Sequence, residues 1–165
     1  MNRRRFIITL GAFFVASTFA VAQRRFNDGK SETELQIVKI KKTDTEWKIL
    51  LSPERFNILR ESGTEPSGSS PLNDEKRKGS YVCAACDLPL FSSEMKYDSK
   101  TGWPSFFTSL PNRTETSIDF KLIYPRTEYH CARCGGHQGH VFNDGPKPTG
   151  KRWCNNGLAL KFLPA

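Results

Sequence analysis

Four of the five cysteines in this chain occur as two C-x-x-C pairs. A C-x-x-C turn lets two thiolates bind one ion, and two such turns complete a closed tetrahedral site of the structural zinc type. Forty-four residues separate the pairs, so a metal would join distant parts of one domain. Two disulfides, a redox-active pair and an iron–sulfur cluster remain as alternatives. The pairs are Cys83 with Cys86 and Cys131 with Cys134.

The fifth cysteine, Cys154, lies in the sequence KRWCNNG and has no partner nearby in the sequence. Lys151 and Arg152 precede it, and cationic neighbours lower the pKa of a thiol and favour the nucleophilic thiolate. A lone cysteine is also often a small, buried apolar residue. If the other four thiols hold a metal, Cys154 is the one cysteine left to act as a nucleophile.

Two further segments carry groups that suit cysteine chemistry. The sequence GGHQGHVFNDG contains His137 and His140, and its glycines predict a loop that wraps a pocket. The sequence TGWPSFF holds Trp103 on a Gly-Trp-Pro turn. Each feature alone is compatible with simple packing. Together, a thiolate, two imidazoles, an arginine and an aromatic wall are the components of a cysteine-based active site.

Reduction of a sulfoxide suits these groups better than peptide hydrolysis, because no local protease signature accompanies the cysteine. In such a reduction the thiolate attacks the sulfoxide sulfur and a protonated histidine donates to the departing oxygen. An indole face stabilises the cation-like sulfur and its methyl group. The cysteine leaves as a sulfenic acid, which a second thiol must reduce. A zinc-stabilised binding module without catalysis and a thiol peroxidase are the competing hypotheses.

The elements that must position these groups are mainly strands. Short runs of strand type, separated by Gly, Pro, Asn and Asp, occur in the sequences YVC, SIDFKLIYP, EYHC and LALKFL. Before them, SPERFNILRESG predicts one helix, with Ser52 as its N-cap, Pro53 in its first turn and Gly63 at its end. We therefore expect residues 46–165 to form one β-rich domain that begins with a helix.

The first 22 residues have the order of a signal peptide: three arginines, an uncharged apolar run and a small-x-small end at Ala22. The sequence NRRRFI resembles the twin-arginine signal, which exports folded proteins. Residues 23–45 are polar and predict a tether, with a short strand at Leu35–Ile40. We expect an exported, periplasmic protein; the alternative is an inner-membrane anchor with the domain outside. Contact with the membrane is expected only through this segment.

The formal net charge of +8 is compatible with nucleic-acid binding. Three of these charges, however, are Arg3, Arg4 and Arg5 in the predicted signal peptide. The remaining Lys and Arg residues are scattered among Asp and Glu rather than gathered in one stretch. No nucleic-acid partner is therefore expected.

Five stretches, taken in order, resemble the methionine-R-sulfoxide reductases of type B: ILRESGTEP, YVCAACDLPLF, KYDSKTGWPSF, TEYHCARCGGHQGHVFNDGPKPTG and RWCNNGLALKF. The resemblance runs from about Trp47 to Phe162, and several unusual motifs in one order make it specific. It implies a mainly β fold of two small, barrel-like antiparallel sheets with peripheral helices. It also implies substrates that carry methionine-R-sulfoxide and one structural zinc ion on Cys83, Cys86, Cys131 and Cys134.

The resemblance further implies roles for the remaining candidates. Cys154 would be the nucleophile and His140 the general acid. Trp103 would receive the substrate methyl group, with Phe142 beside it. The other polar groups around the thiol would be His137, Asp144, Arg152 and Asn156.

The chain departs from the family pattern at one position. Many members carry a resolving cysteine just before the Gly-Trp-Pro-Ser motif, where this chain has Thr101. The chain has no sixth cysteine, so a catalytic disulfide within it would take a thiol from the metal site. We therefore expect a one-cysteine enzyme whose sulfenic acid is reduced by an external thiol, from a thioredoxin-like protein or a small molecule. Trp153 stands where tyrosine is common, which removes no catalytic group.

Overall fold

The computed structural model describes residues 36–165, and the statements below concern this part of the chain. The predicted signal peptide, residues 1–22, and the first part of the predicted tether, residues 23–35, lie outside it. Within the described part, none of the helices has the length and apolar character that crossing a membrane requires.

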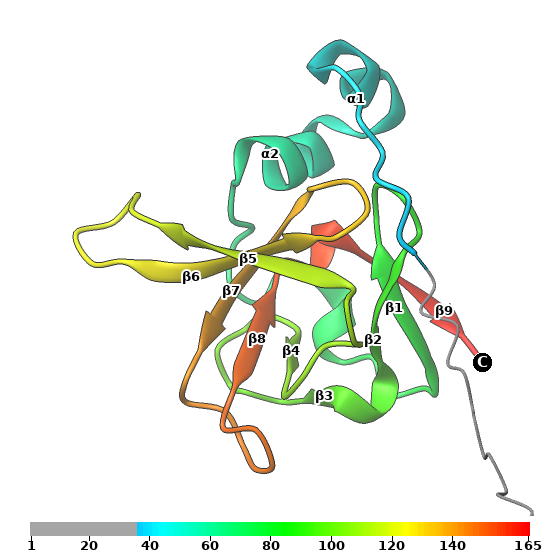
Figure 1. The fold of residues 1–165 in the computed structure, drawn as a ribbon. Coiled ribbons are helices and arrows are strands. Elements are labelled where there is room, and N and C mark those ends of the chain that lie inside the picture. Colours follow the sequence, from blue (N-terminus) through cyan, green and yellow to red (C-terminus); the bar gives the residue numbers. More distant parts are fainter. Residues whose placement is uncertain (1–35) are drawn as a thin grey trace, which may run out of the picture. The chain divides into compact units, whose positions relative to one another are not determined.

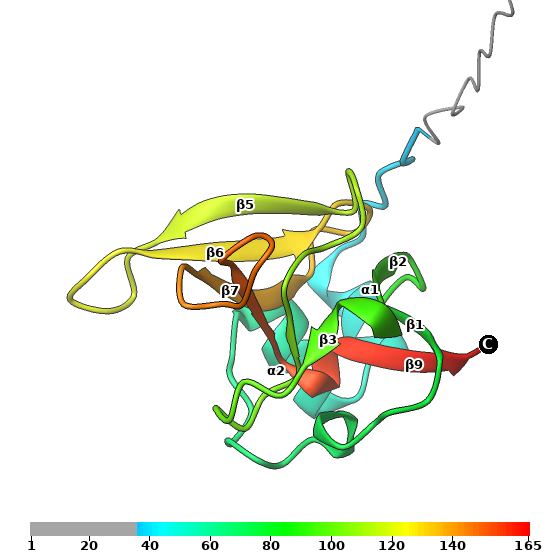
Figure 2. The same ribbon diagram turned by 90° about the horizontal axis from the view of Figure 1, so that it is seen from below.

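Two antiparallel sheets dominate the structure, which confirms the predicted mainly β fold (Figure 1). The smaller sheet has the strand order β2-β1-β9, formed by β2 (Pro89–Ser92), β1 (Gly79–Cys83) and β9 (Leu160–Pro164). The larger sheet has the order β3-β4-β8-β7-β6-β5, formed by β3 (Lys96–Tyr97), β4 (Ser105–Phe106), β8 (Arg152–Asn155), β7 (His137–Phe142), β6 (Arg126–Cys131) and β5 (Thr114–Asp119). The β5–β6 hairpin and the C-terminus extend to opposite sides (Figures 1 and 2).

Helix α2 (Pro53–Glu61) confirms the predicted helix. Ser52 caps it by accepting a hydrogen bond from the Arg55 amide, and Pro53 opens its first turn. The helix ends at Ser62, which takes a left-handed conformation with φ 51°, one residue before the predicted end at Gly63. Three short 3-10 helices also occur in the described part: η1 (Pro71–Asn73), η2 (Ser93–Met95) and η3 (Gly157–Ala159).

A second helix, α1 (Asp44–Leu50), begins where the sequence predicts the end of the polar tether. Thr43 and Glu46 form a capping box, in which each side chain accepts from the other residue's backbone amide. Trp47 is the buried residue of this helix, and the Arg60 guanidinium lies over its ring at 5.1 Å. The packing of this one indole explains why so polar a stretch is helical.

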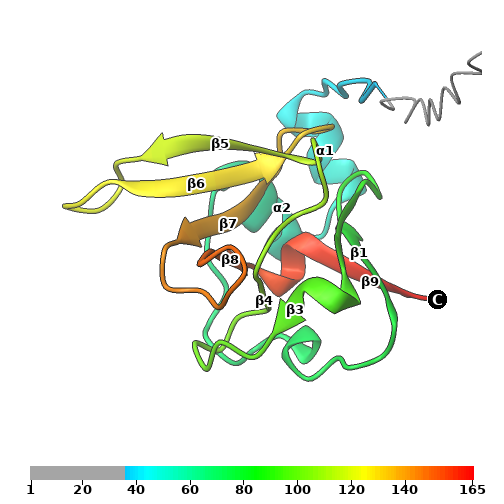
Figure 3. The ribbon, with the colours of Figure 1, turned by 60° about the horizontal axis from the view of Figure 1, so that its bottom comes forward.

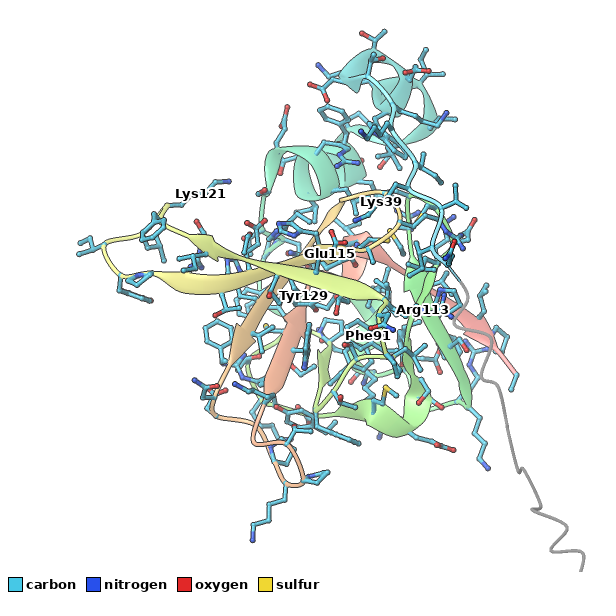
Figure 4. All side chains as sticks on the ribbon, viewed as in Figure 1. Lys39, Phe91, Arg113, Glu115, Lys121 and Tyr129 are labelled. Carbon is cyan, nitrogen blue, oxygen red and sulfur yellow. The ribbon has the colours of Figure 1, made fainter. Side chains whose placement is uncertain are left out.

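The strand predicted at Leu35–Ile40 is not present in the part that the structure describes, residues 36–40. Isolated contacts hold this segment instead. The Ile40 amide donates to the Arg133 carbonyl, and Lys39 pairs with Glu115 on β5 (Figure 4). A strand needs consecutive ladder pairs, and single contacts of this kind do not form one.

The core lies between the two sheets and consists largely of aromatic rings. Phe91 of β2 stacks on Phe106 of β4, with 4.0 Å between ring centroids. Tyr81 of β1 meets the Phe106 ring edge-on at 5.0 Å, and Phe91 meets Tyr129 of β6 in the same way at 6.3 Å (Figure 4). Because the rings come from both sheets, their packing fixes one sheet against the other.

A β-bulge in β7 decides which way its histidines point. Tyr129 of β6 pairs with Gly139, but the next residue along, His130, pairs with His137, so Gln138 is an extra residue in β7. Side chains three apart on a regular strand point to opposite faces, and one extra residue restores them to the same face. His137 and His140 accordingly lie together, with 5.5 Å between ring centroids. The sequence-based prediction of a loop here was wrong, because the segment is a bulged strand.

Gly139 lets β7 approach β8 at the position of the bulge. It pairs with Asn155, and a Cβ atom added at Gly139 would lie 1.9 Å from the carbonyl oxygen of Cys154. That oxygen belongs to a central strand and cannot move without disturbing the sheet.

Replacing Gly139 by Ala should therefore lower the free energy of unfolding by about 2–3 kcal/mol or more, because backbone must shift to remove the overlap. Gly68→Ala is the matched control, since an added Cβ there meets nothing within 4 Å and only the φ of +78° opposes it. The control should cost about 1 kcal/mol. Urea unfolding measures both, and equal losses would contradict the steric explanation.

Candidate active site

The two C-x-x-C pairs form matching turns at the ends of β1 and β6. In each turn, the amide four residues after the first cysteine donates back to the carbonyl of that cysteine. Asp87 donates to the Cys83 carbonyl at 2.9 Å, and Gly135 donates to the Cys131 carbonyl at 2.8 Å. Both closing residues have left-handed backbones, with φ of 57° and 68°. The sequence separates these turns widely, and the fold brings them face to face.

The four sulfur atoms form a cluster that fits a tetrahedral ion. All four lie within 4.8 Å of one another, with Cys83 Sγ 3.7 Å from Cys134 Sγ and Cys86 Sγ 3.5 Å from Cys131 Sγ. A tetrahedron of thiolates about 2.3 Å from a central ion has edges of about 3.8 Å. A disulfide requires about 2.05 Å, and all four cysteines are free thiols. The cluster therefore suits a metal rather than the alternative of two disulfides.

Cys154 lies at the centre of the larger sheet, on β8. It pairs with His140 of β7 on one side and with Ser105 of β4 on the other. Directly paired residues point to the same face, so this register sets the thiol beside the imidazole. Arg152 and Phe142 form another pair of the same ladder, two residues along, and share that face.

A pocket of about 250 Å³ opens over this face of the sheet. This pocket brings together six of the residues predicted from the sequence: Cys154, His140, Arg152, Asn156, Trp103 and Phe142. Its lining consists of Thr64, Thr101, Trp103, Arg126, Gly139, His140, Phe142, Arg152, Cys154, Asn155 and Asn156. The space is of the size that one substrate side chain occupies, and its walls are partly apolar.

His140 is the histidine that reaches the pocket. Its Nε2 lies 2.8 Å from Asp119 Oδ2, and the guanidinium of Arg126 lies 2.6 Å from the same oxygen. Burial lowers the pKa of His140, and the hydrogen bond to Asp119 opposes this. The Asp119 carboxylate, which also accepts from the Lys121 amide, has its pKa lowered and stays ionised. The hydrogen bond between His140 and Asp119 therefore fixes the orientation of the imidazole.

His137 stands behind the pocket rather than in its lining. Only 3% of this residue is exposed, and its Nδ1 lies 2.5 Å from Glu128 Oε1. Burial lowers the pKa of His137, while Glu128 opposes that shift. The imidazole packs against His140 and supports it. The structure therefore separates the roles of two histidines that the sequence placed together.

Arg152 is held by Asp144 through two parallel hydrogen bonds, each 2.8 Å long. Its guanidinium also lies over the ring of Phe142, 4.3 Å from the centroid. Asp144 itself is largely exposed and does not line the pocket. Its function in the site is therefore to position Arg152.

Burial, and not the neighbouring cation, decides the pKa of Cys154. Desolvation raises that pKa above its usual value, although the charge of Arg152 and a hydrogen bond from the Thr101 side chain both lower it. The sequence-based expectation that cationic neighbours yield a low pKa was wrong in its net direction. Arg152 limits the increase but does not reverse it.

Glu65 connects the indole of Trp103 to the side-chain amide of Asn156. Its carboxylate accepts from the amides of Gly157 and Leu158 at 2.6 and 2.8 Å. Its own amide donates to Asn156 Oδ1, and its carbonyl accepts from the indole of Trp103 at 3.1 Å. One buried acidic residue thus positions two groups that the sequence had singled out.

Sequence reasoning missed several residues of the site. They include Asp119, Glu128, Glu65, Arg126 and Thr101 as a contact of the thiol. The alternation of Arg126, Glu128 and His130 along β6 is a signal that identifies a polar face of a strand. For Asp119 and Glu65 no such pattern exists, because their partners come from distant segments.

Replacing Arg152 by Met removes a charge that lowers the Cys154 pKa, so that pKa should rise further. The thiolate fraction at pH 7 should then fall about threefold to tenfold. Alkylation of Cys154 by iodoacetamide, followed on its peptide by mass spectrometry, should slow by the same factor. The effect should vanish once the pH exceeds the pKa in both proteins.

Asp144→Asn is the matched control, because it keeps the guanidinium and removes a carboxylate that raises the Cys154 pKa. Alkylation of this variant should be at least as fast as that of the wild type. Slower alkylation in both variants would show that the orientation of Arg152, and not its charge, sets the reactivity.

Comparison with known proteins agrees with this site. The SelR domain matches residues 51–164. The chain is 48% identical over 125 residues to the peptide methionine sulfoxide reductase MsrB of Leptospira interrogans, which covers 75% of this chain and 95% of that protein. It is 47% identical over 133 residues to MsrB of Agrobacterium fabrum, with 80% and 98% covered. It is 48% identical over 124 residues to MsrB of Methanosarcina barkeri, with 74% and 87% covered. The chain therefore belongs to the type B peptide methionine sulfoxide reductases, which are oxidoreductases that act on sulfur.

Proposed function

We propose that this enzyme reduces the R epimer of methionine sulfoxide in oxidised proteins, and of free methionine sulfoxide as well, with Cys154 as its nucleophile. One observation carries the proposal: the Cys154 thiol lies beside His140 in a pocket that the aromatic side chains of Trp103 and Phe142 also line. The other four thiols of the chain are gathered at the metal centre. No other cysteine is therefore left for the chemistry.

In the first step, the thiolate of Cys154 attacks the sulfoxide sulfur while one proton is delivered to the sulfoxide oxygen. The sulfur–oxygen bond of the substrate breaks, and the oxygen becomes bonded to the sulfur of Cys154. The products are methionine and Cys154 sulfenic acid. The substrate sulfur gains the electron pair that the cysteine sulfur loses, so the step is balanced by the single proton.

His140 supplies that proton. Its imidazole is paired with Asp119, which orients it and favours its charged form, while burial lowers its pKa and so makes the charged form a stronger acid than a free imidazolium. Because the pKa of His140 is lowered and that of Cys154 is raised, the reactive thiolate–imidazolium form is a minor fraction at neutral pH. Its fraction is constant between the two pKa values and falls on either side of them.

The aromatic walls select the substrate. The sulfur and its methyl group acquire positive charge as the oxygen is protonated, and the face of Trp103 stabilises that charge. Phe142 lines the same pocket, with the guanidinium of Arg152 over its ring. Asn156, held by Glu65 and by the Gln138 carbonyl, keeps the end of the pocket rigid. A rigid and asymmetric pocket distinguishes the two epimers of a sulfoxide.

The sulfenic acid is reduced by an external thiol. Thr101 occupies the pocket beside Cys154, where a resolving cysteine would stand, and its hydroxyl cannot form a disulfide. One thiol displaces water to form a mixed disulfide, and a second thiol releases the free Cys154. A thioredoxin-like protein with two thiols, or two molecules of a small thiol, completes this reaction.

The four-cysteine cluster would hold one zinc ion. Cys83, Cys86, Cys131 and Cys134 together complete its coordination and leave no position open for substrate. When bound, the ion supplies structural rigidity rather than chemistry. We also propose that residues 1–22 direct export to the periplasm, by the twin-arginine route that carries folded proteins, which would let the metal bind before export. The alternative of an inner-membrane anchor keeps the domain on the same side.

The reductase assay tests the function directly. With dithiothreitol as reductant, the wild-type enzyme should consume N-acetyl-methionine-R-sulfoxide and leave the S epimer unchanged. Cys154→Ser should lower kcat by about 10⁴-fold or more, because the hydroxyl is a poor nucleophile at neutral pH. A thermal melt of the variant close to that of the wild type shows that its fold is intact. Consumption of the S epimer, or faster consumption of peroxide than of sulfoxide, would reject the proposal.

Metal analysis tests the second site. Purified protein should contain one zinc ion per chain, and Cys131→Ser should lose it together with about 10 °C or more in Tm. Cys154→Ser is the matched control and should keep both the metal and the Tm. Two disulfides by mass spectrometry, or the visible absorption of an iron–sulfur cluster, would show that the zinc assignment is wrong.

A further inference from the structure

The loop of the β5–β6 hairpin exposes a cluster of apolar side chains. Between Asp119 at the end of β5 and Arg126 at the start of β6, four large apolar residues are exposed, two of them by 73% and 106%. We call this set the apolar tip; it consists of Phe120, Leu122, Ile123 and Tyr124. The tip stands out from the rest of the sheet in every view (Figures 1 and 3). Contiguous apolar exposure of this kind marks an interaction surface.

The base of the hairpin is part of the active site. Asp119 and Arg126 pair across the hairpin as its last ladder position. Asp119 binds the imidazole of His140, and Arg126 lines the substrate pocket. The apolar tip is therefore continuous with the surface that receives the substrate, since Phe120 directly follows Asp119 and Tyr124 lies two residues before Arg126.

The tip is also held against the rim of the pocket. The ammonium group of Lys121 donates to the carbonyls of Glu61 and Ser62, at 3.2 and 3.3 Å, at the end of α2 (Figure 4). Two residues further along the chain, Thr64 lines the pocket. The hairpin is thus fixed next to the pocket mouth by contacts at its base and at its loop.

The chemistry of the substrate matches this arrangement. A pocket of about 250 Å³ accommodates one side chain, so the polypeptide on either side of the sulfoxide must lie on the surface around it. Methionine oxidation turns an apolar side chain polar and disrupts the core from which it comes. The flanking chain that becomes accessible is accordingly rich in apolar residues.

From these observations we propose that the apolar tip is the docking surface for apolar, extended segments that flank methionine sulfoxide in unfolded protein substrates. The proposal rests on the proposed function and specifies the substrate class of the same site.

A lipid surface fits the tip less well. Binding to anionic lipid relies on free cations beside the apolar residues. Within residues 119–126 the two cations are Lys121 and Arg126, and both are already engaged, with backbone carbonyls and with Asp119. An apolar polypeptide segment needs no such charge.

The test compares two substrates with the full chain, using dithiothreitol as reductant for both so that docking of a protein reductant plays no part. One substrate is methionine-oxidised β-casein, which is unfolded, and the other is N-acetyl-methionine-R-sulfoxide. The variant is Phe120→Ser combined with Ile123→Ser. The matched control is Val38→Ser combined with Ile49→Ser, which removes apolar residues of similar exposure, 79% and 78%, away from the hairpin.

The tip variant should raise KM for the oxidised casein about tenfold, because the contact area of two large side chains is lost. Its kcat/KM for the small substrate should stay within about twofold of the wild type, and the control should leave both substrates unchanged.

An unchanged KM for the casein, or an equal loss on both substrates, would overturn the docking role. So would reduced sedimentation of the tip variant with phosphatidylglycerol vesicles while its KM for casein stays unchanged, since the tip would then contact lipid. Failure of the proposed function has a different signature: the wild-type enzyme would not turn over the small R-sulfoxide at all.

Discussion

The structure depends on the hydrogen bonds of one extra residue, Gln138. Its side-chain amide donates to Cys83 Sγ at 3.4 Å, in the four-cysteine cluster. Its carbonyl accepts from the amide and from the side chain of Asn156, at 2.8 and 3.1 Å, behind the pocket. The same residue creates the bulge that places both histidine side chains on one face of β7. Because Gln138 is fully buried, water cannot replace these bonds, and the four-cysteine cluster and the active site are mechanically connected through it.

The charges around the thiol are arranged in pairs, and this pairing explains the electrostatics of the site. Asp119 is bound to Arg126, Glu128 lies against a histidine, and Arg152 is bound to Asp144. Each cation is partly neutralised by its own carboxylate. Desolvation therefore affects the pKa of Cys154 more strongly than the positive charges do. The carboxylates also fix the positions of the imidazole of His140 and the guanidinium of Arg152, which line the same pocket as the thiol.

Short-range patterns in the sequence predicted much of this arrangement. The C-x-x-C turns and the Ser52 cap depend on residues that are neighbours in the chain, so local spacing was sufficient to find them. β7 was taken for a loop because its glycines suggest turns, whereas Gly139 in fact permits close approach of β8. Asp119 was missed because the register of strands distant in sequence brings it to His140, and no local pattern specifies that register. Helix α1 was missed because its seven residues are too few to show a helical periodicity, although Thr43 and Glu46 carry the local pattern of a capping box.

The burial of Cys154 has a consequence for the survival of the enzyme between turnovers. Peroxides and similar oxidants react with thiolates, and at neutral pH desolvation keeps most of this sulfur as the thiol. A chain without a second thiol beside Cys154 has no internal means to intercept a sulfenic acid formed at the wrong time, and further oxidation to the sulfinic acid is irreversible. For the nucleophile that we propose, the same burial that keeps the sulfur protonated thus protects the enzyme from the oxidants whose damage it would repair.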